Sequence, residues 1–255
     1  MVIVTSLARV TLLEAVRNRL LWLVAAVIVI AFGLAQFLGQ VAITETREIQ
    51  AALLAAFLRV SAAFVVVTFV ITSTVREFND KVTELLLSLP ARRASYFFGK
   101  FSGYALVAAV LAPLCALPLA LFAHFGGLAA WTVSLVCELL ILTAVSLFCV
   151  LSLTQVVPAF AAVAGFYLLS RSMAAMQLIA SAALQDPTAA DRVVNAIVKL
   201  IALALPALDR MTQTNWLLES SAPSAAALGA ILGQTVTYIA LIGAAALFDL
   251  YRKNF

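Results

Sequence analysis

The chain has 255 residues, of which 65% are hydrophobic and 11% are charged, with a formal net charge of +4 and a mean hydropathy of +1.11. Soluble domains are about half apolar and about a quarter charged, so this composition excludes an ordinary soluble domain and predicts an all-α integral membrane protein. The positive charge then bears on orientation in the bilayer rather than on nucleic acid. The three cysteines lack the spacing of a metal site or a disulfide framework.

Residues 1–19 predict an amphipathic helix at the membrane surface, because one apolar stripe recurs at helical spacing while Arg9 and Arg17 lie off it. A first span is predicted at about Leu20–Leu38. This apolar run is longer than that of a secretory signal peptide (about 7–15 residues), so a cleaved signal peptide is not expected. After a short polar loop, a second span is predicted at about Ala51–Val75.

A charged stretch follows and predicts a short helix over residues 76–90. Its apolar residues recur at helical spacing, and a proline ends it. Two opposite-charge pairs four residues apart would support the helix. These pairs are Arg76 with Asp80 and Glu77 with Lys81. A helix apolar on one side, charged on the other and followed by basic residues fits the cytoplasmic membrane surface, where it could touch a soluble partner. The alternative is an ordinary charged loop between two spans.

Four further spans are predicted in the rest of the chain. Val193–Leu205 is too short to be another and predicts a re-entrant or interfacial helix. The approximate ranges are 101–123 for the third span, 124–130 for a tight Gly-Gly loop, 130–153 for the fourth span, 158–183 for the fifth span, 184–224 for an outer segment and 225–250 for the sixth span.

The loop charges predict the orientation. With six spans and the N-terminus inside, the cytoplasmic side carries ten basic residues and the outer side four, which is the asymmetry of the positive-inside rule. A seventh span at Val193–Leu205 would place the basic tail, Arg252 and Lys253, outside. The prediction is therefore six spans in the inner (plasma) membrane, with both termini in the cytoplasm.

Three ionisable residues lie inside predicted spans, namely Arg59, Glu138 and Arg171. Charge in hydrocarbon is costly, so such residues face the interior of a bundle and find partners. At about 1.5 Å per helical residue, each lies roughly 12 Å from the outer end of its span, in the outer half of the bilayer. We therefore expect Glu138 to pair with Arg59 or Arg171. A contact with a substrate is the alternative.

Few residues point to catalysis. The chain has no P-loop motif, and its single histidine, His124, sits beside two glycines in a predicted loop. No Ser/His/Asp set or pair of carboxylates lies at one predicted membrane depth, so no enzyme activity and no bound cofactor or metal is expected on this chain. Glycines spaced four apart predict close helix approach at two places. These pairs are Gly99 with Gly103 and Gly229 with Gly233.

Four segments together resemble those of one transporter family. They are Arg76-Glu77 with Thr83–Pro90 and Arg92, Glu14–Leu20 at the entry to the first span, Leu205–Arg210 before the sixth span, and the basic tail Tyr251–Lys253. With the basic N-terminus and six spans, this pattern resembles the permease subunits of ABC-2-type transporters. The likeness covers essentially the whole chain, but only residues 76–93 are specific. In that family a glycine often stands just before the threonine that corresponds to Thr83. This chain lacks the glycine and has Lys81-Val82 in its place.

The resemblance implies a permease that forms a homodimer, or a heterodimer with a second permease, and binds two copies of a separate ATPase subunit that carries ATP and Mg²⁺. Closure of that ATPase would be transmitted through the helix at 76–90 and drive export of a substrate that the sequence does not identify. The coupling residues would be Arg76, Glu77, Asp80, Lys81 and Glu84. One alternative is a non-transporting subunit that remodels a periplasmic partner. The other is a membrane lipid-group transferase, which would need clustered carboxylates or a metal motif.

Overall fold

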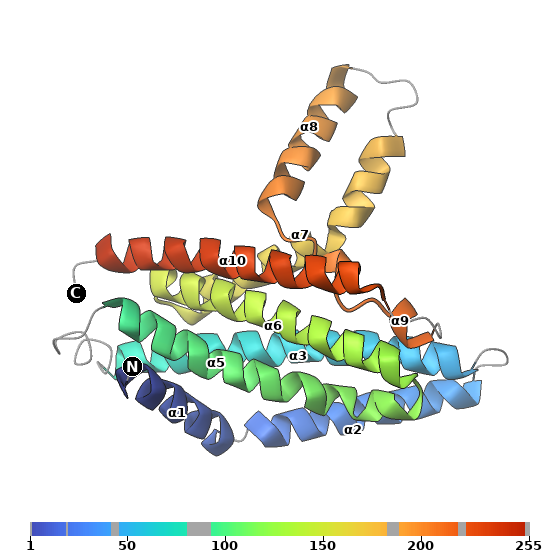
Figure 1. Cartoon of the computed structure of the whole chain (residues 1–255), viewed down its shortest axis with the longest axis horizontal. Coiled ribbons are helices and arrows are strands. Elements are labelled where there is room, and N and C mark those ends of the chain that lie inside the picture. Colours follow the sequence, from blue (N-terminus) through green and yellow to red (C-terminus); the bar gives the residue numbers. More distant parts are fainter. Residues whose placement is uncertain are drawn as a thin grey trace.

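The computed structural model describes residues 2–18, 20–41, 46–80, 93–182, 189–218 and 223–252. These residues contain helices and no β-strand, and Figure 1 shows most of the helices aligned in one bundle. The helices in chain order are α1 (Val2–Arg17), α2 (Leu20–Val41), α3 (Thr46–Asn79), α5 (Arg93–Ala116), η1 (Pro118–Leu121), α6 (Phe125–Leu153), α7 (Val156–Ala182), α8 (Ala189–Ala204), η3 (Leu208–Arg210), α9 (Asn215–Leu218) and α10 (Ala225–Arg252).

The predicted all-α membrane class is confirmed. Among the described residues, five helices are long and apolar enough to cross a membrane, and the bent pair α1–α2 raises the number to six. The predicted six spans equal this upper count in number, although the sixth span is there α1 and α2 taken together and not residues 20–38 alone. The five are α3, α5 with η1, α6, α7 and α10.

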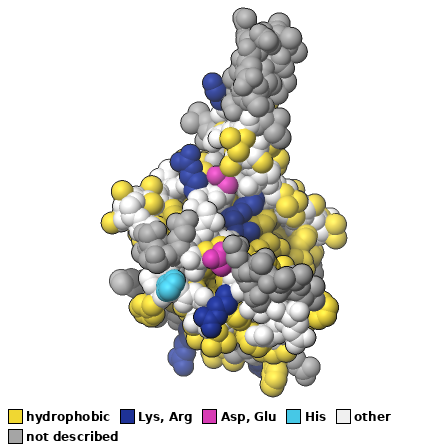
Figure 2. Space-filling model, turned by 90° about the vertical axis from the view of Figure 1, so that its right-hand side faces the viewer, with side chains coloured by type: hydrophobic (Ala, Val, Ile, Leu, Met, Phe, Trp, Pro, Cys, Tyr) yellow, Lys and Arg dark blue, Asp and Glu magenta, His cyan; other side chains and the backbone are white. Residues whose placement is uncertain are grey.

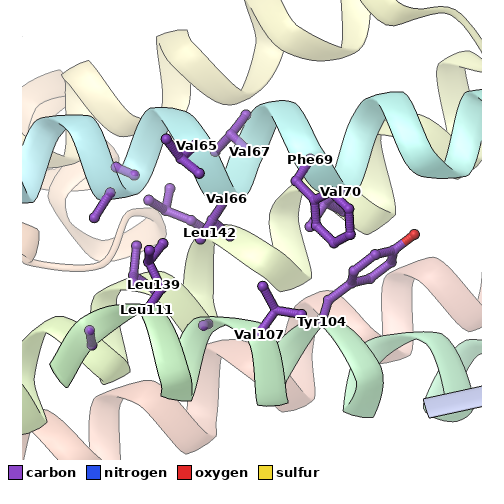
Figure 3. Close-up of a cluster of buried hydrophobic side chains, with 14 of the residues drawn as sticks. Val65, Val66, Val67, Phe69, Val70, Tyr104, Val107, Leu111, Leu139 and Leu142 are labelled. Atoms are coloured by element: carbon purple, nitrogen blue, oxygen red, sulfur yellow. The ribbon is translucent and has the colours of Figure 1, made fainter. Parts of the chain in front are cut away.

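Helix α6 lies at the centre of the bundle. It is apolar all round, as expected of a fully buried helix, and it packs against α3, α5, α7 and α10. In Figure 3, Leu139 and Leu142 of α6 meet a row of valines on α3 and Leu111 of α5. These side chains are buried in the core cluster. In a bilayer such contacts stabilise the bundle through tight packing rather than through removal from water, because lipid tails are as apolar as leucine.

The close approach predicted at Gly99 and Gly103 is confirmed. Both glycines face α1. A Cβ atom added to Gly99 would lie 2.9 Å from Leu7 Cδ1, and one added to Gly103 would lie 2.7 Å from Thr11 Cβ. The missing side chains therefore let α1 lie directly on α5. The second predicted glycine pair, on α10, has no neighbouring atom within 4 Å among the described residues.

Three predicted boundaries differ from the structure. The second span continues as α3 to Asn79, so the start of the predicted helix at 76–90 is the last turn of α3. Its residues from 81 onward lie outside the described part of the chain. Helix α5 begins at Arg93, well before the predicted third span, and ends ahead of Pro118, which has no N–H to continue the helix. In each case hydropathy marks the apolar run, whereas backbone hydrogen bonds set the end of the helix.

The loop predicted at 124–130 is instead the first turn of α6, which begins at Phe125. Gly127 lies in this turn, where an added Cβ atom would come within 1.7 Å of the carbonyl oxygen of Trp216. The glycine is needed for close packing against α9 rather than for a tight turn. Glycine permits both, so the sequence alone did not distinguish them.

Helix α8 and the end of α7 leave the bundle side by side, as Figure 1 shows. Helix α8 occupies the place of the short helix predicted at 193–205, but it lies outside the bundle rather than re-entering it. Its exposed apolar side chains are Val193, Ile197 and Leu200. The chain returns to the bundle after α8. The buried residues of this return include Pro206, Leu208, Met211, Thr212 and Leu217.

Candidate functional site

Glu77, predicted to be a solvated residue that faces a partner, is held inside the chain. Its side chain is 17% exposed, and its carboxylate accepts hydrogen bonds from Lys100 Nζ and from the Tyr96 hydroxyl at 3.4 Å. Lys100 lies in α5 and is only 2% exposed. A lysine this deeply buried needs a counter-ion, so Glu77 ties the end of α3 to α5. A solvated Glu77 was therefore the wrong expectation, because a partner from another helix buries it. The predicted pair with Lys81 lies outside the described residues.

Arg76, in the same turn, pairs with α1. Its Nη2 lies 3.1 Å from Glu14 Oε1, and Ser73 Oγ donates to Glu14 Oε2 at 2.9 Å. The Tyr104 hydroxyl donates in turn to Ser73 Oγ at 3.1 Å. The expected partner Asp80 lies just past the end of α3, where its backbone N–H donates to the Arg76 carbonyl at 2.9 Å. The turn containing Arg76 and Glu77 therefore joins α1, α3 and α5 in one polar network.

The predicted coupling residues thus fall into three groups. Glu77 is engaged internally, while the Arg76 side chain is 59% exposed and Asp80 is exposed. Lys81 and Glu84 lie outside the described residues. Arg76 and Asp80 are therefore the two described residues of this set that a partner could reach, and the coupling role of the set stays a prediction.

The three ionisable residues of the predicted spans gather in the bundle. Glu138 of α6 is fully buried, and Arg171 Nη1 of α7 lies 3.9 Å from its Oε2 atom. Of the two expected partners, Arg171 is therefore the one in ion-pair range. The shorter contacts of the Arg171 guanidinium are to backbone carbonyls, at 2.5 Å from Leu208 and 3.1 Å from Met211. Arg171 thus holds the returning segment as well as the carboxylate.

Thr212, which the sequence analysis did not single out, is where these contacts meet. Its hydroxyl donates to Glu138 Oε2 at 2.5 Å, its N–H donates to Ser134 Oγ at 2.9 Å, and its carbonyl accepts from Arg59 Nη1 at 3.2 Å. Its φ is 47°, a left-handed conformation that costs a β-branched residue about 1–3 kcal/mol. The surrounding hydrogen bonds hold it there. The one sequence signal was Ser134, four residues before Glu138 and therefore on the same face of α6.

Several polar atoms in this cluster retain hydrogen-bonding capacity. Glu138 Oε1, Arg59 Nε and Tyr167 Oη are buried and have no hydrogen-bond partner among the described residues. A buried polar atom without a partner costs about 1–3 kcal/mol.

Two hollows border this region. An apolar hollow of about 280 Å³ lies between α3 and α7 over α6, and Tyr167 and Phe64 are in its lining. A second, of about 330 Å³, is lined by Arg47, Glu48 and His124 among others. Figure 2 shows the end of the bundle that carries the histidine, and on its described part basic and acidic side chains are scattered among apolar ones without a broad patch of one sign. Within the described residues, no group of His, Cys, Asp or Glu could hold a metal ion.

With this geometry established, the chain was compared with known proteins. No family model and no curated protein matches it. Function is therefore inferred from the two polar clusters and from the helices that carry them.

The two clusters join different sets of helices and share α3. One joins α1, α3 and α5 near Glu77. The other fastens the segment around Thr212 to α3, α6 and α7. Helix α3 contributes Arg76 and Glu77 to the first cluster and Arg59 to the second. At about 1.5 Å per residue, roughly 27 Å of helix separates Arg59 from Glu77. A displacement of α3 would therefore act on both.

Proposed function

We propose that this chain is the membrane-spanning permease subunit of an ABC-2-type, ATP-driven exporter. The observation that best supports the proposal is the convergence of four chain segments at one end of the bundle. The start of α1, the end of α3, the start of α5 and the end of α10 lie together there (Figure 1). The positive-inside count predicts that this end is cytoplasmic. A separate ATPase subunit would bind there and carry ATP and Mg²⁺.

In this proposal Glu77 transmits movement and does not itself contact the ATPase. Arg76 and Asp80 are exposed next to it and would contact the ATPase. Lys81 and Glu84 would complete this contact. A push on this turn would reach α5 through the pair of Glu77 with Lys100, and α1 through the pair of Arg76 with Glu14. The pair of Glu77 with the buried Lys100 resists separation because each partner would be left uncompensated. Helix α1 would follow α5 because it lies directly on α5 at Gly99 and Gly103. The three helices would therefore move together.

The cluster at Thr212 would hold the bundle closed on the side opposite the proposed ATPase contact. Release of the Thr212 segment from Glu138 and Arg171 would uncover the polar atoms of the cluster and open a route between the helices. Transport in such a system requires alternating access, which a second permease copy would complete. The face of α10 opposite α6 offers apolar surface for a lipid or for that copy, since Val236, Leu241 and Phe248 are all exposed.

The test is co-purification followed by measurement of coupling. The full chain, extracted from its native membrane in mild detergent, should carry an ATPase with Walker motifs, and vesicles containing the complex should hydrolyse ATP. Asp80→Lys should weaken the ATPase association several-fold. The matched control Glu48→Lys, an exposed charge reversal at the opposite end of α3, should leave it unchanged. Absence of an associated ATPase, or equal effects of the two variants, would overturn the proposal.

One feature favours a second candidate function. Helix α8 and the end of α7 project from the bundle (Figure 1) and present apolar side chains. Such a projection could pass ATP-driven movement to a protein outside the membrane, as a non-transporting remodelling subunit would. Vesicles that hydrolyse ATP and export substrates of several classes would exclude this candidate. Hydrolysis that depends on an added partner protein, without transport, would support it.

A further inference from the structure

A hollow of about 470 Å³, lined by both charged and apolar side chains, lies between α1 and the last turn of α3. This is within the size range of small-molecule sites, about 300–1,000 Å³. No residue of the Thr212 cluster lines it, and of the proposed ATPase contact only Arg76 does. Its lining residues are Val10, Leu13, Glu14, Arg17, Asn18 and Arg76.

The hollow can bind an anion. Arg17 and Arg76 both contribute guanidinium groups, whereas the single carboxylate, that of Glu14, already accepts hydrogen bonds from Arg76 and Ser73. Arg17 is exposed, and the described residues supply it with no ion pair. Arg76 uses one amino group for Glu14, which leaves its other donors available. Guanidinium forks match the oxygens of a phosphate group and bind it more strongly than neutral donors do.

The apolar part of the lining indicates that the anion belongs to a lipid. Val10 and Leu13 are 57% and 58% exposed, and they lie beside the charged groups on the same helix. A soluble phosphate would gain nothing from these two side chains, whereas an acyl chain attached to a headgroup would cover them.

The position of the hollow also fits the headgroup layer. Helix α3 has 34 residues, roughly 50 Å at 1.5 Å per residue, and therefore exceeds the hydrocarbon core of about 30 Å. Arg76 is in its last turn. Trp22, four residues after Asn18, is 78% exposed, and exposed tryptophans gather at membrane–water interfaces.

We propose that this hollow binds the phosphodiester headgroup of an anionic phospholipid from the leaflet that borders α1. Arg17 and Arg76 hold the phosphate, and Val10 and Leu13 contact the first methylenes of the acyl chains. Basic pockets between membrane helices bind anionic headgroups in this way. The site shares Arg76 with the proposed ATPase contact. Its test rests on Arg17, which lies outside that contact, so the site stands or fails separately from the proposed function.

The test uses the full chain reconstituted in phosphatidylcholine vesicles, with brominated phosphatidylglycerol as a quencher of Trp22 fluorescence. The Trp22→Phe variant supplies the background from Trp131 and Trp216. We expect phosphatidylglycerol to be preferred over brominated phosphatidylcholine by about fivefold or more, since one basic residue near the surface changes binding by about that factor. Arg17→Gln should abolish most of this preference. Arg9→Gln, the same change at an exposed arginine of α1 outside the hollow, should retain it.

Each other outcome overturns the proposal. Equal loss in Arg9→Gln and Arg17→Gln would show a general surface potential instead of a site. Displacement of the quencher by millimolar glycerol phosphate or inorganic phosphate would show a site for soluble phosphate. An absence of preference in the unaltered chain, which needs no variant to be folded, would show that the hollow does not select anionic lipid. Loss of the preference when an ATPase subunit is added would assign the hollow to that protein.

Discussion

The pair of Glu77 with Lys100 gives the sharpest test of the structure, because its two members are buried to different degrees. Glu77→Gln leaves the Lys100 ammonium, 2% exposed, without a counter-ion, and such a change costs about 3–5 kcal/mol. Lys100→Met should cost less, about 1–3 kcal/mol. The cost is smaller because the Glu77 carboxylate would still accept a hydrogen bond from the Tyr96 hydroxyl and, being 17% exposed, would still contact water. The double variant should recover most of the loss, since replacing both charges removes the uncompensated one.

The measurement is reversible unfolding in mixed micelles of SDS and a mild detergent, followed by tryptophan fluorescence. The two single variants and the double variant form a cycle, and we expect a coupling energy of about 3 kcal/mol or more, at or above the upper end for residues in contact. Glu48→Gln, an exposed carboxylate at the other end of α3, is the control and should change stability by less than about 0.5 kcal/mol. If Glu77→Gln is as mild as Glu48→Gln, then Glu77 is a surface residue and the assignment of a transmitting role is refuted.

Three further outcomes follow from the structure. Thr212→Val, which removes the hydroxyl bonded to Glu138 but keeps the shape, should lower stability by about 1–3 kcal/mol in the same unfolding assay; no change would mean that the hydroxyl does not hold the segment. Gly103→Ala should lower stability by about 1–3 kcal/mol because its methyl group would meet α1, whereas Gly229→Ala should be neutral in the monomer, and a loss of dimer with Gly229→Ala would instead place that glycine at a copy–copy contact. In a chain without native cysteines, a membrane-impermeant thiol reagent applied to intact cells should label Arg210→Cys but not Arg252→Cys; labelling of both would overturn the six-span topology.

The apolar runs of the sequence predicted the helical class, and the rule that buried charges find partners predicted the meeting of Glu138 with an arginine. Both predictions follow from the properties of the bilayer, because hydrocarbon penalises an isolated charge and an unpaired backbone group at any position along the chain. Thr212 could not be predicted, because its role comes from a left-handed backbone and from hydrogen bonds to residues far away in the chain. In the sequence, Lys100 is one of several basic residues that follow the charged stretch, and nothing local marks it as buried. Its burial depends on the distance from α5 to α3, which no local pattern encodes.

The contact of α1 with α5 through Gly99 and Gly103 has a mechanical consequence. A surface helix joined to a bundle only by a short linker can drift along the membrane, whereas two helices packed backbone to backbone behave as one thicker, stiffer rod. A spin label near the N-terminus would therefore follow the tilt of α5. Its distance to a second label on α5 should stay constant through any working cycle.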